Sequence, residues 1–170
     1  MKRWIPLAAA MTVCGCQTLP DEPERATAQL QPTPGNKTFG EATFERTGSK
    51  VRLTVFAQGL KPGQEHGLHV HEVGDCGNGG ENAKGHFNPF GKPHGAPQAA
   101  EHHAGDLPAL AANPQGRAKI QFDVDGITLD SGSSGILGRS LVVHANPDDY
   151  KTQPSGNSGS RIACGVIQPG

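Results

Sequence analysis

Apolar and polar residues alternate along several short segments of this chain, which is the pattern of half-buried β-strands. Residues 51–57 place aliphatic side chains at every second position, and residues 118–127 do the same with Ile120, Phe122 and Val124. Similar segments at 39–46, 66–72, 140–145 and 161–167 complete the series. Their spacing, with Gly- and Pro-containing turns between them, predicts an antiparallel sandwich or barrel.

Two long segments without this alternation interrupt the strands, at about residues 73–105 and 146–160. Loops of this length in a compact domain are usually functional or disordered. The first contains His86, His94 and His103, with Asp106 directly after it. We therefore expect it to be functional.

Composition agrees with an all-β domain. The chain has 170 residues, 24 glycines, 14 prolines and only 5% aromatic residues, which favours many turns and short strands in one domain. Its formal net charge of -1 gives no reason to expect nucleic acid as a partner.

The N-terminus has the features of an export signal. Lys2 and Arg3 precede an apolar run that is too short to span a bilayer, and the run ends in Val13-Cys14-Gly15-Cys16. This resembles a bacterial lipoprotein signal over residues 1–15, with Cys16 as the lipidated first mature residue. An ordinary secretory signal is the alternative. Either one implies export to the periplasm or cell envelope, and lipidation would add a membrane anchor whose leaflet the sequence leaves open.

Residues 16–36 are polar and rich in proline, and they show no apolar periodicity. We interpret them as a flexible tether that precedes a folded domain over residues 37–170. An N-terminal strand hidden in this segment is the alternative.

Export also changes the interpretation of the cysteines. Once Cys14 leaves with the signal and Cys16 carries lipid, Cys76 and Cys164 remain. In an oxidising compartment such a pair most simply forms a disulfide, and the alternative is two free thiols that bind metal.

The histidines carry the chemistry. Two of them, His69 and His71, lie two apart on a predicted strand, so both project from one face, while Leu68 and Val70 take the other. His144 ends another strand, and the first long loop supplies more imidazoles. Imidazole with one carboxylate suits copper and zinc. Six histidines and one aspartate exceed one four-coordinate site, which favours two metals or one site with spare ligands.

These residues occur in an ordered set of motifs: Gly-Leu-His-Val-His, Gly85–Pro89, His94-Gly95, His103–Leu107, Gly138–His144 and Gly156–Ile167. Together they resemble copper,zinc superoxide dismutase from about residue 38 to 167. The resemblance implies a Greek-key antiparallel barrel of about eight strands, with the two long loops forming the metal site.

The resemblance also implies roles for individual residues. Copper would be bound by His69, His71, His86 and His144, and zinc by His86, His94, His103 and Asp106. The imidazole of His86 would bridge the metals. Arg161 would guide the anion, Asp148 would link His69 to His94, and Cys76 would pair with Cys164.

The implied reaction converts two superoxide radicals into O₂ and hydrogen peroxide by cycling of copper between two oxidation states, which zinc cannot do. In the envelope this would protect the cell from external superoxide. A non-catalytic copper- and zinc-binding protein of the same fold is the main alternative. A zinc hydrolase would need an open zinc position and a nearby carboxylate base, and the implied zinc site is closed.

Some neighbouring residues are open to simpler interpretations. His66 has the parity of the core residues and is expected to be structural, and the spacing His-x-Gly-Asp selects His103 over His102. Lysines 84, 92 and 151 could steer superoxide or be ordinary solvated side chains. Cys76 lies closer to His71 than in the animal enzymes, and the loop after His144 is shorter, so the animal dimer interface cannot be transferred. A homodimer is one expected assembly.

Overall fold

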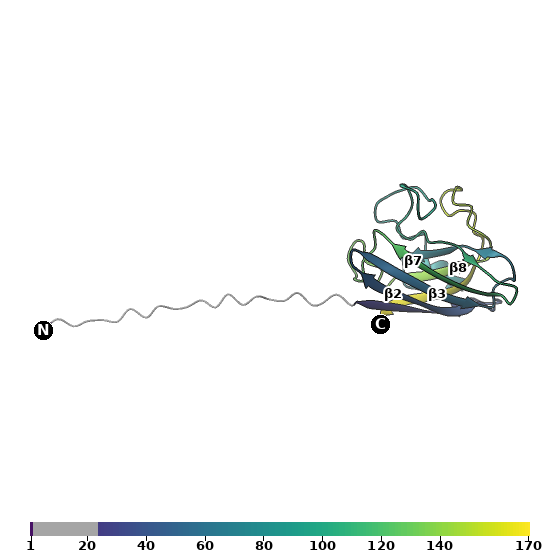
Figure 1. Cartoon of the computed structure of the whole chain (residues 1–170), viewed down its shortest axis with the longest axis horizontal. Helices are drawn as coiled ribbons and strands as arrows, with labels where there is room; N and C mark the ends of the chain where they lie inside the picture. Colours follow the sequence, from purple (N-terminus) through teal and green to yellow (C-terminus); the bar gives the residue numbers. More distant parts are fainter. Residues whose placement is uncertain (2–23) are drawn as a thin grey trace.

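A curled antiparallel β-sheet forms the body of the molecule (Figure 1). The structure is a computed structural model that describes Met1 and residues 24–170. Within those residues seven strands make one sheet in the order β5-β8-β9-β1-β2-β3-β7, and β4 pairs with β6. The elements are β1 Arg25–Pro32, β2 Phe39–Thr47, β3 Lys50–Gln58, β4 Glu65–His66, β5 Leu68–His71, the 3₁₀ segment η1 Asn78–Ala83, β6 Leu110–Ala111, β7 Arg117–Val124, β8 Ser140–His144 and β9 Arg161–Pro169. The prediction of an all-β antiparallel barrel is confirmed.

The predicted signal, the lipidation site Cys16 and the first part of the predicted tether fall within residues 2–23, outside the described residues. In the part of the chain that is described, no helix is long and apolar enough to cross a membrane.

The alternation of residues determines the sheet as predicted. β2 and β3 form a hairpin in which Thr47 pairs with Lys50, and Gly48 adopts a φ of +62° in the two-residue turn, a conformation that favours glycine. On the inner face Leu53 lies opposite Phe122 of β7. Burial of every second side chain in these strands builds the core that supports the site.

The prediction of a flexible tether over residues 16–36 is wrong for its second half, where the structure has the strand β1. β1 pairs with β2 on one side and with β9 on the other, and it buries Ala26, Ala28 and Leu30. Two of these three inward residues are alanines, and polar residues separate them. The alternation of apolar and polar residues was therefore too weak to predict a strand. The pairing of both edges with neighbouring strands supplies the stability that the composition did not indicate.

The strand predicted at 66–72 is two strands that meet at Gly67. β4 pairs with β6, whereas β5 pairs with β8. A Cβ at Gly67 would lie 2.9 Å from the Cβ of Ser158, so glycine lets the second long loop approach the chain closely. This change of partner directs β5 beneath the loops.

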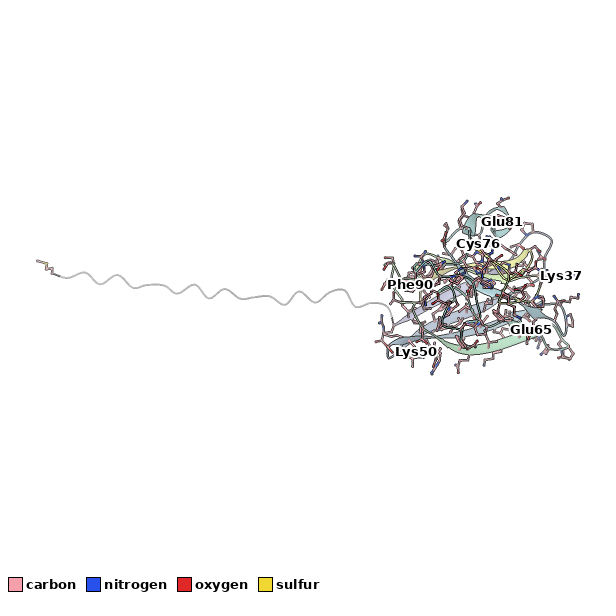
Figure 2. All side chains as sticks on the ribbon, turned by 90° about the horizontal axis from the view of Figure 1, so that it is seen from above. Lys37, Lys50, Glu65, Cys76, Glu81 and Phe90 are labelled. Carbon is pink, nitrogen blue, oxygen red and sulfur yellow. A yellow bond between two sulfur atoms is a disulfide. The ribbon has the colours of Figure 1, made fainter. Side chains whose placement is uncertain are left out.

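Both long loops rise from the same side of the barrel in Figure 1. The first, between β5 and β6, is joined to β9 by a disulfide between Cys76 and Cys164, as predicted (Figure 2). The loops cover the outer faces of β5 and β8, and this leaves all four residues of β5 buried.

Candidate metal centre

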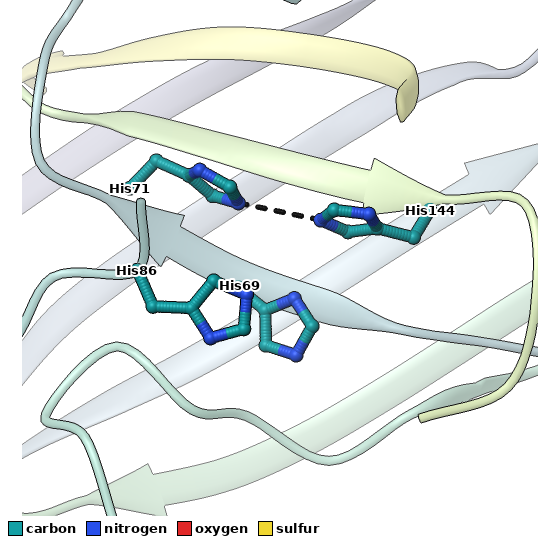
Figure 3. A group of neighbouring side chains, drawn as sticks. All are labelled: His69, His71, His86 and His144. Atoms are coloured by element: carbon teal, nitrogen blue, oxygen red, sulfur yellow. Dashed lines mark hydrogen bonds between the residues drawn. The ribbon is translucent and has the colours of Figure 1, made fainter. Parts of the chain in front are cut away.

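Four histidines gather where β5 and the end of β8 lie side by side (Figure 3). His69 and His71 project from β5, His144 ends β8, and His86 comes from the first long loop. The Nε2 atoms of His71 and His144 are 3.3 Å apart. One potential ligand atom from each of the four lies within 4.8 Å of the others, and all four residues are buried.

Each of these four rings has one nitrogen held by an acceptor in the protein. His69 Nε2 donates to Asp148 at 2.7 Å, His71 Nδ1 to the carbonyl of Lys84 at 2.8 Å, His144 Nδ1 to the carbonyl of Gly159 at 3.0 Å, and His86 Nδ1 lies 2.9 Å from Asp106. In His69, His71 and His144 such contacts fix ring orientation and leave the second nitrogen as a ligand, whereas His86 belongs to both ligand groups.

The remaining nitrogens include two buried atoms without a hydrogen-bond partner, His69 Nδ1 and His86 Nε2. A buried polar atom without a partner is costly unless something else binds it. Four imidazole nitrogens that face one point fit a copper ion, for which imidazole is a preferred ligand.

A second group of candidate metal ligands, formed by His86, His94, His103 and Asp106, shares His86 with the first group. The carboxylate Oδ2 of Asp106 accepts from the backbone N–H groups of Gly95 at 3.1 Å and His103 at 2.8 Å. Its Oδ1 faces the Nδ1 atoms of His86, His94 and His103 at 2.9, 3.0 and 3.3 Å. Ligand atoms of a tetrahedral zinc site are separated by about 3.3 Å. Three nitrogens and one oxygen at these spacings therefore fit zinc.

Asp148 connects the two sets. Its Oδ2 accepts from His69 Nε2 at 2.7 Å and its Oδ1 from His94 Nε2 at 3.0 Å. Gly156 packs against this carboxylate with a φ of +64°, and a Cβ there would overlap the Asp148 oxygen. The second long loop therefore carries a carboxylate and the glycine that makes room for it.

The histidines differ in the direction in which their surroundings shift the pKa. Burial, and the charges of nearby histidines, lower the pKa of His86 to about 4 and of His144 to about 3. Burial opposes the charged form of His94 as well, but hydrogen bonds to Asp106 and Asp148 outweigh it and raise its pKa to about 9. The first group is thus kept neutral, the form that binds metal, while a positive charge is favoured between the two carboxylates.

Both carboxylates are held in the charged form. Burial acts against ionisation of Asp106, but hydrogen bonds from His103, His86 and His94 hold its pKa well below the ordinary range. The same balance, with hydrogen bonds from His69 and His94, lowers the pKa of Asp148. Two buried carboxylates held in the charged form make a site that attracts cations.

A cavity of about 640 Å³ opens over the first set of histidines, and Arg161 forms part of its wall. The guanidinium is fixed by donation from Nη1 to the carbonyl of Gly80 and from Nη2 to the carbonyl of Lys84. Lys84 also lines this cavity, whereas Lys92 lines a different one and donates to the carbonyl of Ala100. Of the three lysines considered as steering groups, only Lys84 is placed beside Arg161.

Two further histidines have other partners. His66 is buried, its Nδ1 donates to the carbonyl of His144 at 2.8 Å, and its Nε2 accepts from the backbone of Lys61. His102 donates to the carbonyl of His103 and belongs to neither ligand group.

The sequence did not predict three residues that hold parts of the site in place. The side chain of Gln153 holds His94 by its backbone, with contacts of 2.8 Å to its N–H and 2.9 Å to its carbonyl. Thr33 donates to the carbonyl of Arg161, and Glu81 lies beside the guanidinium. Each acts through contacts distant in sequence, so no local motif could indicate it.

Fold and site together define a class: an antiparallel barrel with two adjoining sets of metal ligands that share His86 beneath an open cavity. Residues 38–167 match the family described as copper/zinc superoxide dismutase. The chain belongs to this family. It is an enzyme that acts on superoxide, and its cofactors are copper and zinc.

Individual relatives agree with this assignment. The chain is 42% identical over 149 residues to the Cu-Zn superoxide dismutase 2 of Aquifex aeolicus, an alignment that covers 85% of this chain and 86% of the relative. It is 36% identical over 177 residues to the extracellular Cu-Zn superoxide dismutase of Caenorhabditis elegans, with coverage of 98% and 78%. The crystal structure of the clock protein EA4 superposes with a TM-score of 0.79 at 38% identity, with coverage of 88% and 96%.

Proposed function

We propose that the residues of this chain divide the work of superoxide dismutation as follows. His69, His71, His86 and His144 bind copper, and His86, His94, His103 and Asp106 bind zinc. The observation that carries this proposal is the position of His86, whose Nδ1 lies among the zinc-side ligands while its Nε2 is buried without a partner on the copper side. Copper bound there supplies the one-electron exchange that oxidises one superoxide to O₂ and reduces a second one to peroxide.

The second half of the reaction consumes protons, and His86 is placed to deliver one. Its Nε2 belongs to the histidine set beneath the cavity, and its Nδ1 is fixed by Asp106. In this assignment His86 takes up and releases one proton per cycle.

Arg161 attracts and orients the anion. Its guanidinium is permanently charged, and two backbone carbonyls hold it at the wall of the cavity. A fixed cation at the wall of the cavity raises the local concentration of a small anion even when the net charge of the protein is slightly negative. Lys84 adds a second positive group to the same wall.

Loading the metal-free protein with copper alone, with zinc alone and with both tests this division of roles. We expect superoxide consumption only in the samples that contain copper, with the highest rate when both metals are present. A zinc-only sample as active as the fully loaded one would contradict the proposal.

We infer export and membrane anchoring from the lipoprotein-like pattern of residues 1–16. One relative is named as an extracellular enzyme, which supports export of this chain as well. We propose that Cys16 carries lipid and that the domain protects the cell envelope from external superoxide. Detection of the acylated N-terminal peptide by mass spectrometry of the native protein tests the anchor.

A second candidate is a metal-binding protein of the same fold that does not turn over superoxide. This candidate is supported by the structural similarity to a protein described as a clock protein. The two candidates differ in superoxide consumption by the fully loaded protein.

A further inference from the structure

Glu81 lies at the mouth of the cavity with its carboxylate beside Arg161. The distance from Glu81 Oε1 to Arg161 Nε is 3.5 Å. The Glu81 side chain is 62% exposed, whereas that of Arg161 is 12% exposed. Both residues line the cavity over the histidines, and Glu81 belongs to η1, in the same loop between β5 and β6 as Cys76 (both labelled in Figure 2). An acidic group therefore accompanies the cation proposed to capture an anionic substrate.

Hydrogen bonds hold the side chain and the backbone of Arg161, so the guanidinium stays beside the Glu81 carboxylate. Its guanidinium donates to the carbonyls of Gly80 and Lys84, and its own carbonyl accepts from the Thr33 hydroxyl. A guanidinium has five N–H donors, so others stay available for a ligand. An anion that enters the cavity must therefore bind a cation that Glu81 already neutralises in part.

We propose that Glu81 is a specificity-determining residue, which weakens the attraction of Arg161 for anions and discriminates against those of higher charge. The proposal rests on the proposed role of Arg161. Repulsion between Glu81 and a ligand grows in proportion to ligand charge. In water, a monoanion about 6 Å away is repelled enough to change its affinity by about threefold, and a dianion by about tenfold. Superoxide carries one charge and loses about threefold in affinity, whereas the phosphate dianion loses about tenfold.

The test uses azide and inorganic phosphate as probes on the copper- and zinc-loaded protein. Azide binding is followed by its absorption band with Cu(II), and phosphate by its competition with azide. At low ionic strength, and at a pH where phosphate is mainly the dianion, Glu81→Gln should tighten azide binding about threefold and phosphate binding about tenfold. At 1 M salt, where the Debye length is about 3 Å, both differences should largely disappear. Metal content should equal that of the parent.

Glu72 provides a matched control, because it lines the same cavity but is not part of the ion pair with Arg161. Glu72→Gln should change both affinities by less than Glu81→Gln does. The effect of Glu81→Gln should also shrink when Arg161 is replaced by Met. Unchanged affinities in Glu81→Gln, or equal effects from both glutamate variants, would overturn the proposal. Failure of the parent to consume superoxide would instead overturn the proposed function, and the azide titration would still measure the effect of Glu81.

Discussion

The hydroxyl of Thr33 donates a 2.7 Å hydrogen bond to the backbone carbonyl of Arg161. Thr33 follows β1, is 6% exposed, and itself accepts from the side chain of Asn36 at 2.8 Å. The residue that follows the N-terminal strand thus holds the backbone of Arg161, the residue proposed to bind the anion.

Thr33→Val removes this hydroxyl and keeps the shape of the side chain. We expect a loss of about 1–2 kcal/mol in the free energy of unfolding, because the carbonyl of Arg161 and the Asn36 amide both lose a partner. Denaturant unfolding measures it. Azide affinity should also fall, since Arg161 is less well positioned, and Thr33→Ser should restore both quantities. Equal unfolding free energies for the valine variant and the parent would show that the contact does not stabilise the fold.

The disulfide should contribute strongly to stability. Cys76 and Cys164 are separated by 88 residues, and closing a loop of this length stabilises the folded state by on the order of 4–5 kcal/mol in the chain-entropy treatment. The double variant Cys76→Ala/Cys164→Ala should unfold at correspondingly lower denaturant concentration. It should also bind anions less well, because the loop that the bond joins to β9 supplies the carbonyls of Gly80 and Lys84 to Arg161. A variant as stable as the oxidised parent would contradict this.

Asp148 should couple the two metals. Asp148→Asn replaces an oxygen that accepts from His69 or His94 with an amide that cannot, so both ligand sets lose orientation. Outer contacts of this kind typically change metal affinity by about 10–100-fold. Competition with a chelator measures each metal. Asp149→Asn is the matched control, since the Asp149 carboxylate accepts hydrogen bonds from the nearby turn residues Lys151 and Thr152. If Asp148→Asn binds both metals as the parent does, the link is not functional.

The metal-free protein should lose stability on mild acidification. The pKa values of His86 and His144 are lowered in the folded state to about 4 and 3, from an ordinary 6.5. Protons then bind more readily to the unfolded chain, so the stabilisation is present above pH 6.5 and is lost as the pH falls toward 4. His94, with its pKa raised to about 9, acts in the opposite direction and loses its contribution only as the pH rises toward 9. Unfolding free energies from pH 7 to 4.5 should therefore decrease. A flat profile would contradict the lowered pKa values.

Sequence patterns predicted the parts of this molecule that depend on local alternation or on residue chemistry. The period of two identified β3 and β7, and the pair His69 and His71 placed both imidazoles on one face, as observed. The alternation did not predict β1, because two of its three core residues are alanines between polar neighbours. The break at Gly67 and the contacts of Gln153 and Glu81 arise from tertiary packing between distant segments, which leaves no local pattern.

Metal content and superoxide consumption of the His144→Ala variant test the central claim most directly. In this structure His144 belongs only to the first ligand group, whereas His86 belongs to both. The parent should hold about one copper and one zinc per chain and consume superoxide. The variant should keep zinc, lose copper and lose activity. Full activity or full copper occupancy in His144→Ala would contradict the proposed division of ligands.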